Sequence, residues 1–163
     1  MTKIIVVDED DNIIGSKERE LVDKERLRYR ISALWIKNSK NEILLARRAF
    51  TKTHDPGKWG PAVAGTVEEG ETYESNIIKE AEEELGLKGI EIKKAQKTKK
   101  EGKHRYFVQR FTTTIDIPIS KFKIQKDEVA EVKWFSKEEL ELQLKTHPEE
   151  FIESIKSTAM LFY

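Results

Sequence analysis

Apolar runs rich in β-branched residues recur along the chain and predict a protein built mainly on strands. The runs, each bounded by polar clusters that favour turns, cover residues 3–8, 31–36, 42–46, 61–66, 89–97, 105–115 and 129–135. The first run and the apolar residues 13–15 flank a polar turn, so we expect an N-terminal hairpin over about residues 3–15. The mostly charged residues 16–28 are interpreted as a partly helical surface connector.

Other segments have helix signals instead. Thr72 is a good N-cap and Gly86 is typical of a helix end, so the residues between them are expected to form a helix. Ser136 opens the capping-box pattern Ser-x-x-Glu, and Thr146 precedes a Pro that favours another helix start. C-terminal helices are therefore expected over about residues 136–161. A mixed sheet with one helix in mid-chain and helices at the end is an α/β sandwich.

The mid-chain helix carries two kinds of side chain on two faces. At about 100° per residue, one stripe is apolar and comprises Ile77, Ile78, Ala81 and Leu85. The neighbouring stripe gathers Glu80, Glu83 and Glu84. Because like charges within one helical turn repel each other, we expect a cation among these three carboxylates. Oxygen ligands without Cys or a nearby His favour a hard ion such as Mg²⁺ or Mn²⁺.

The segment from Gly65 to Leu87 resembles the signature of the Nudix hydrolases, Gly-x5-Glu-x7-Arg-Glu-U-x-Glu-Glu-x-Gly-U, where U is a bulky aliphatic residue. The positions that match are Gly65, Glu71, Glu80, Glu83, Glu84, Gly86 and Leu87. Ala81 is a small residue at an aliphatic position, and Lys79 stands where the family has Arg. An ammonium cannot reproduce the two parallel hydrogen bonds of a guanidinium, so we expect weakened positioning, with Lys79 paired with Glu71 or Glu83.

The resemblance implies a single Nudix domain over residues 1–163 with an α/β/α sandwich fold. It also implies a metal-dependent pyrophosphohydrolase that cleaves the diphosphate linkage of a nucleoside diphosphate joined to another moiety, or of a related nucleotide. We expect the metal ligands to be Glu80, Glu83 and Glu84, with Glu71, Lys79 and Gly65 in supporting positions. The general base is expected to be a helix glutamate, such as Glu80 or Glu83, or Glu128 in a loop that the family often uses for this role.

Segments outside the signature are similar to the branch of the family that contains isopentenyl-diphosphate isomerase. From that resemblance, Arg48 and Lys52 match positions that hold diphosphate. The isomerase needs a catalytic Cys and a metal-binding His in the strand after Trp59, and residues 60–65 contain neither. Isomerisation is therefore not expected. Trp59 itself could stack on a substrate base or fill the edge of the core, and the sequence leaves both open.

Composition narrows the partners and the compartment. Lys plus Arg and Asp plus Glu number 30 each, so net charge indicates no specific nucleic acid partner, and the basic residues 97–103 are typical of a solvated hairpin tip. The chain has no Cys, no signal-peptide pattern and no run that could span a bilayer, so a cytoplasmic protein is expected. The resemblance is compatible with a homodimer. The main rival function is a catalytically weak Nudix-fold domain that binds a nucleotide, with Lys79 as the mark of lost activity.

Overall fold

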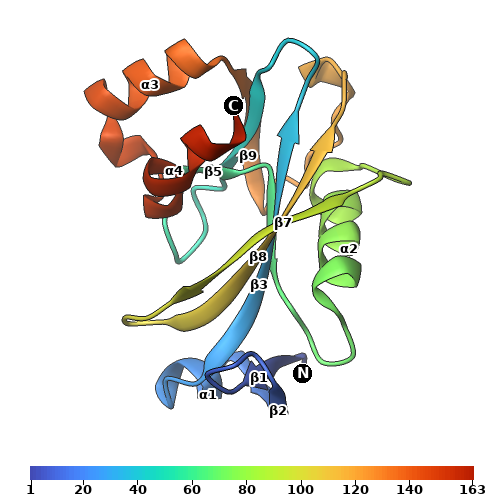
Figure 1. Cartoon of the computed structure of the whole chain (residues 1–163), viewed down its shortest axis with the longest axis vertical. Helices are drawn as coiled ribbons and strands as arrows, with labels where there is room; N and C mark the ends of the chain where they lie inside the picture. The colour runs from blue at the N-terminus through green and yellow to red at the C-terminus, as the bar shows by residue number, and fades with distance from the viewer.

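Nine strands form one mixed sheet with helices on both sides in the computed structural model, which describes residues 1–163 (Figure 1). The strands are β1 (Lys3–Val7), β2 (Ile13–Glu18), β3 (Arg28–Lys37), β4 (Ile43–Arg48), β5 (Trp59–Pro61), β6 (Val63–Thr66), β7 (Lys93–Lys100), β8 (Arg105–Thr114) and β9 (Val129–Phe135). The helices are α1 (Arg19–Lys24), α2 (Tyr73–Leu85), α3 (Lys137–Thr146) and α4 (Glu153–Thr158), and single 3-10 turns are η1 (Ile119–Lys121), η2 (Pro148–Glu150) and η3 (Ala159–Phe162). The predicted α/β fold is confirmed.

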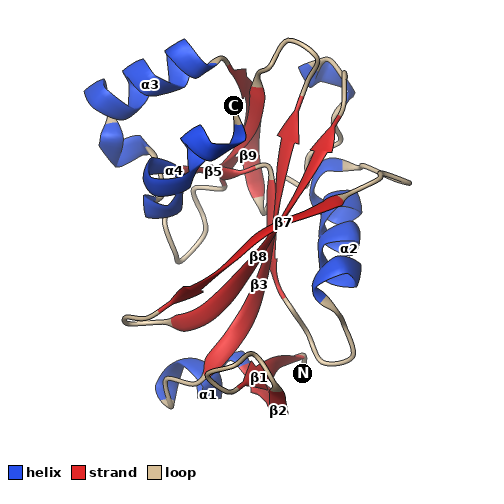
Figure 2. Cartoon of the chain, viewed as in Figure 1, coloured by secondary structure: helices blue, strands red, loops and turns tan.

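The central strand of the sheet is β3. It pairs in parallel with β8 along its whole length, and its other edge is shared in turn by β1, β6 and β4, all antiparallel. Only the last two residues of β3 pair with β4, which continues instead against β5 and β9. The sheet therefore divides into two wings beyond this junction (Figure 2).

Alternation along β3 assigns its side chains to two cores. Leu34 and Ile36 face α2 and join a cluster that also holds Ile5 from the N-terminal hairpin. Trp35 points to the opposite side, where it packs with residues of α3 and α4 in a second cluster. Because successive side chains of a strand point to opposite faces, one apolar run serves both helical layers. The two layers lie on either side of the sheet in Figure 1.

The mid-chain helix agrees with its predicted bounds but not fully with its predicted apolar stripe. Ser75 N donates to Thr72 Oγ1 at 3.1 Å, and Gly86 ends the helix with φ +70°, so both end signals are confirmed. Ile78, however, is 45% exposed, whereas Asn76 is fully buried. The prediction for Ile78 was wrong because the buried face of α2 is rotated toward Asn76, which meets the side-chain-free Gly65.

The C-terminal region begins as predicted and then departs from the prediction. Ser136 caps α3 by accepting a hydrogen bond from Glu139 N at 3.1 Å. The next helix does not start at Thr146, because Phe151 is extended and forms a parallel bridge with Trp59 in β5. An extended residue cannot lie inside a helix, so α4 begins only at Glu153. No helix in the structure is long and apolar enough to cross a membrane.

Candidate functional site

Gly65 in β6 brings the acidic face of α2 against the sheet. A Cβ at this position would lie 2.6 Å from Glu80 Cγ and 3.0 Å from Asn76 Oδ1. Only glycine permits so close an approach without displacing Glu80. The glycine of the signature therefore has a steric role, since the absence of a side chain lets Glu80 pack directly against β6.

Glu80, Glu84 and Glu128 come together at the C-terminal end of α2. Burial and the nearby charges of Glu80 and Glu128 raise the pKa of Glu84 to about 9, and a hydrogen bond with the Glu80 carboxyl acts in the same direction. Burial also raises the pKa of Glu80, although Lys79 opposes this effect. The end of a helix is its negative pole, which disfavours a further carboxylate there. The charge of Lys52 acts in the opposite direction but only partly offsets burial and the neighbouring carboxylates around Glu84.

Two loops hold Glu128 and Lys52 against this end of the helix. Gln125 N donates to Glu84 O at 2.9 Å, and Ala49 N donates to Glu128 O at 3.0 Å. Lys52 Nζ then lies 2.6 Å from Glu128 Oε2. The structure therefore brings both predicted loop residues, Lys52 and Glu128, to the carboxylates of α2.

Lys79 and Glu71 form the support beneath the cluster. Lys79 Nζ lies 2.5 Å from Glu71 Oε1 and 3.2 Å from Glu68 Oε2. The other Glu71 oxygen accepts from Glu68 N and from Asn76 Nδ2, each at 2.9 Å. Burial alone would raise the pKa of Glu71, but these hydrogen bonds hold it below its usual value. Of the two partners predicted for Lys79, the structure selects Glu71.

Asn76 is a component of the site that the sequence analysis missed. Its side chain is fully buried, and Nδ2 donates to Thr66 O at 3.1 Å as well as to Glu71. Its Oδ1 has no hydrogen-bond partner. One signal was available: a polar amide four residues before Glu80 lies on the same side of the helix. Asn76 thus links β6, Glu71 and α2.

Two predicted substrate residues form no hydrogen bond or ion pair with the carboxylates. Trp59 is only 6% exposed and packs edge-on against Phe135, with ring centroids 5.2 Å apart. Its interpretation as a substrate-stacking residue is corrected to a core residue, because the bridge between β5 and Phe151 encloses the ring. Arg48 donates from Nε to His54 O at 2.9 Å, so it braces its own loop and pairs with no carboxylate.

The carboxylates have the donor chemistry of a site for a hard divalent ion. Glu83 is exposed, and neither Glu83 nor Glu84 has a basic partner within 4.0 Å. In the present arrangement no three His, Asp or Glu side chains converge closely enough to form a finished ion cage. The donor set still fits Mg²⁺ or Mn²⁺, since it consists of oxygens only and Glu84 has no basic partner within 4.0 Å.

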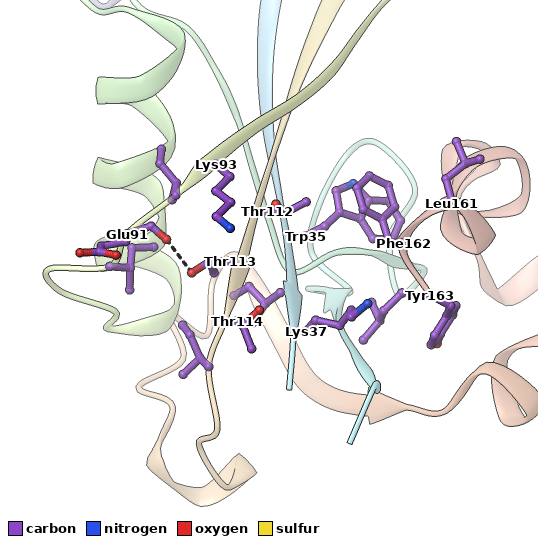
Figure 3. Close-up of a pocket in the computed structure, with 15 residues that line it drawn as sticks. Trp35, Lys37, Glu91, Lys93, Thr112, Thr113, Thr114, Leu161, Phe162 and Tyr163 are labelled. Atoms are coloured by element: carbon purple, nitrogen blue, oxygen red, sulfur yellow. Dashed lines mark hydrogen bonds between the residues drawn. The ribbon is translucent and has the colours of Figure 1, made fainter. Parts of the chain in front are cut away.

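A cavity of about 760 Å³ lies elsewhere, at the ends of β3, β7 and β8 (Figure 3). Trp35, Thr112 and the C-terminal residues Phe162 and Tyr163 line it, and Phe162 stacks on Trp35. None of the signature glutamates contributes to its wall. The cavity is therefore separate from the carboxylate cluster.

Comparisons with known proteins agree with the geometry. The model of the NUDIX domain matches residues 26–155. The chain belongs to the Nudix family. An uncharacterized Nudix hydrolase of Yersinia pestis is 32% identical over 136 residues, which cover 83% of this chain and 73% of that protein. The Nudix chain described here is accordingly a hydrolase that acts on diphosphate bonds, and enzymes of this family are metal-dependent pyrophosphatases that act on nucleotides.

Two further similarities concern the fold and the branch. A crystal structure from Deinococcus radiodurans superimposes with a TM-score of 0.82 at 20% identity and covers 99% of both chains. The isopentenyl-diphosphate Delta-isomerase of Serratia proteamaculans is 35% identical over 84 residues, which cover 52% of this chain and 47% of that protein. The first shows the fold of this Nudix protein, and the second supports the predicted resemblance to the isomerase branch.

Proposed function

We propose that this Nudix protein is a metal-dependent pyrophosphohydrolase that cleaves the diphosphate linkage of a nucleoside diphosphate joined to another moiety, or of a related nucleotide. One observation carries the proposal. Glu80, Glu84 and Glu128 lie near one another beside Lys52, while Glu84 is partly buried and has no basic partner within 4.0 Å. A carboxyl whose pKa is raised by burial and by neighbouring carboxylates is a group that a bound cation would help to ionise.

The ligands of Mg²⁺ (or Mn²⁺) in this proposal are Glu80, Glu83 and Glu84. The chemistry that a divalent ion supplies in such a site is acidification of a water and neutralisation of charge on phosphoryl oxygens. Gly65 lets Glu80 lie close to the sheet. The Lys79–Glu71 ion pair holds α2 to the loop that precedes it. These supporting contacts fix the positions of the ligands before any substrate binds.

Lys52 and Glu128 have complementary roles. Their ion pair of 2.6 Å, with exposed fractions of 29% and 36% for the two side chains, is accessible to a substrate. The Lys52 ammonium exchanges Glu128 for a phosphate oxygen, and Arg48, the last residue of β4, assists it. Glu128, thereby released, accepts the proton of the attacking water. The pair thus keeps both groups near the carboxylates until the substrate separates them.

A substrate panel tests the proposal directly. Nucleoside diphosphate sugars, NADH, ADP-ribose and nucleoside triphosphates are incubated with wild type and with Glu84→Gln, in Mg²⁺ and in EDTA. Glu82→Gln is the matched control, because Glu82 is exposed on the same helix and contacts only Lys88, at 3.7 Å. Turnover of at least one compound by wild type and Glu82→Gln, lost in EDTA and in Glu84→Gln, is the expected result.

The same substrate panel distinguishes the hydrolase from the rival function, a Nudix-fold domain that binds a nucleotide with little or no catalysis. No turnover of any compound in Mg²⁺ or Mn²⁺, together with a nucleotide that raises the melting temperature, would replace the hydrolase by a nucleotide-binding domain. The retained Lys79–Glu71 contact argues against such a loss of activity. Residues 60–65, which follow Trp59 without Cys or His, continue to argue against an isomerase.

A further inference from the structure

The side-chain amide of Asn76 is buried in a fixed orientation. Asn76 is fully buried on α2, and its Nδ2 donates to Glu71 Oε2 at 2.9 Å and to Thr66 O at 3.1 Å. A carbonyl and an ionised carboxylate only accept hydrogen bonds, so the amide must present its nitrogen, not its oxygen, to both. Asn76 is therefore a donor to Glu71.

Two side chains of α2 hold the two oxygens of the Glu71 carboxylate. Lys79 Nζ lies 2.5 Å from Glu71 Oε1, and Asn76 Nδ2 lies 2.9 Å from Oε2. Asn76 and Lys79 are three residues apart, so they are neighbours on the surface of the helix. The Glu71 carboxylate is thus held at both oxygens by an ammonium and an amide.

A single guanidinium could make both contacts by itself. Arginine donates two parallel N–H groups to the two oxygens of one carboxylate, whereas an ammonium acts as a point charge. The Nudix signature has Arg at position 79, and this chain has Lys79. The ion pair of Lys79 is with Glu71 Oε1, so Asn76 supplies the hydrogen bond that is needed at the other oxygen.

These contacts reach a proposed metal ligand, Glu80, by two routes. Lys79 Nζ lies 3.8 Å from Glu80 Oε1, so a shift of Lys79 would move a positive charge beside that carboxylate. Asn76 lies one helical turn before Glu80, and both side chains pack against the side-chain-free Gly65. The position of Glu80 therefore depends on the same side chains that hold Glu71.

We propose that Asn76 and Lys79 together replace the arginine of the signature, and that Asn76 is a positioning residue for the metal-binding carboxylate of Glu80. The inference rests on the proposed function, since it takes Glu80 as a ligand of Mg²⁺ or Mn²⁺. It explains how the chain keeps Glu71 in place without a guanidinium. It also predicts that the two positions are coupled: an arginine at position 79 should matter little while Asn76 is present and much more when Asn76 is absent.

A double-mutant cycle tests this coupling. Steady-state rates are measured over a Mg²⁺ titration for wild type, Asn76→Ala, Lys79→Arg and the double variant. Asn76→Ala is expected to lower kcat about tenfold or more and to raise the Mg²⁺ concentration that gives half the maximal rate, with the KM for the nucleotide within about twofold. Lys79→Arg should change kcat by less than about fivefold alone and restore most of the loss in the double variant.

Controls separate positioning from a purely structural role. Lys88→Arg, combined with Asn76→Ala, is the matched control, because Lys88 contacts only Glu82, at 3.7 Å; it should restore nothing. If Asn76→Ala does not fold, Asn76→Ser takes its place, since a hydroxyl donates one hydrogen bond where the amide donates two. A structural Asn76 would lower the melting temperature when replaced, and Lys79→Arg would then restore neither kcat nor the Mg²⁺ requirement.

Mn²⁺ binding without substrate separates this inference from the proposed hydrolysis. Titrations followed by electron paramagnetic resonance are made with the same four proteins. Asn76→Ala should bind Mn²⁺ about tenfold or more weakly than wild type, and Lys79→Arg should restore the affinity in that background. This result supports the inference even if no compound is hydrolysed. Wild-type affinity in Asn76→Ala, or no recovery in the double variant, overturns it, and a wild type that binds no Mn²⁺ overturns the metal site as well.

Discussion

A carboxyl group lies near each end of α2, and the two differ in whether basic side chains are paired with them. Near the start of the helix, Asp11 is only 7% exposed in its side chain and lies 2.7 Å from both Arg30 and Lys97. Tyr73, the first residue of α2, donates from its hydroxyl to Asp11 Oδ2 at 2.9 Å. At the other end, Glu84 is partly buried beside Glu80 and Glu128 and has no basic partner within 4.0 Å.

The pKa values of the two carboxyls follow from these surroundings. Burial would raise the pKa of Asp11, but hydrogen bonds from Lys97, Arg30 and Tyr73 hold it below its usual value. Burial and like charges raise the pKa of Glu84 to about 9. Two cations surround the single carboxylate of Asp11, and this network ties the N-terminal hairpin to the sheet. Around Glu84 the carboxyl groups outnumber the nearby cation, Lys52, as expected where a ligand supplies further positive charge.

Glu84→Gln is expected to have the largest effect on activity. Loss of a metal-binding carboxylate should lower kcat/KM by at least about 100-fold, since changes even to groups that only support metal ligands cost 10- to 100-fold. The melting temperature in EDTA should not fall, because Gln has the shape of the Glu84 carboxyl, whose raised pKa already disfavours its ionised form. Initial rates and thermal unfolding measure the two effects. Unchanged rates, or a markedly lower melting temperature, would show that Glu84 is structural.

Asp11→Asn is expected to give the reverse result. Arg30 and Lys97 lose their common counter-ion, which should lower the free energy of unfolding by about 2–3 kcal/mol, less than for a fully buried pair because Lys97 is 41% exposed. The kcat/KM of the folded protein should stay within about twofold. Urea unfolding and initial rates test this. If Asp11→Asn lowers kcat/KM but leaves the free energy of unfolding unchanged, the proposed difference between the two ends of α2 is wrong.

Acidification should remove the contribution of Asp11. The folded-state pKa of this carboxyl is lower than its unfolded value of about 3.8, so its stabilising effect is present above that value and is lost as the pH falls through the folded pKa. The difference in unfolding free energy between wild type and Asp11→Asn should therefore narrow below about pH 4. Urea midpoints at pH 3, 4 and 6 measure it. A difference that widens on acidification would mean that the protonated form is the stabilising one.

Lys79→Arg is expected to have the smallest effect. One ammonium already bridges Glu71 and Glu68, so a guanidinium should improve the positioning of Glu80 only modestly, with a rise in kcat of less than about fivefold. Lys79→Gln, which removes the charge, should lower kcat instead. Steady-state rates at saturating Mg²⁺ distinguish them. A large decrease in Lys79→Arg would show that the bridge to Glu68 requires an ammonium.

Features that depend on neighbouring residues were predictable from the sequence. The bounds of α2 follow from Thr72 and Gly86, and the start of α3 follows from Ser136, because capping involves only residues within one turn. The N-terminal hairpin and the carboxylates of the signature likewise belong to short segments. Two predictions were wrong, the place of Ile78 in the buried stripe and the helix start at Thr146. Each depends on a segment distant in sequence, Gly65 in the first case and Trp59 in the second.

The sequence by itself determined the acidic stripe of α2 and the match to the family signature, including Lys79 at the position where the signature has Arg. Tertiary structure alone decided which charges are paired: Lys79 meets Glu71, Lys52 meets Glu128, and Glu84 meets no opposite charge within 4.0 Å. The physical reason is range. Helix periodicity and caps act over three or four residues, whereas the burial and pairing of a charge depend on strands and loops that are distant in sequence.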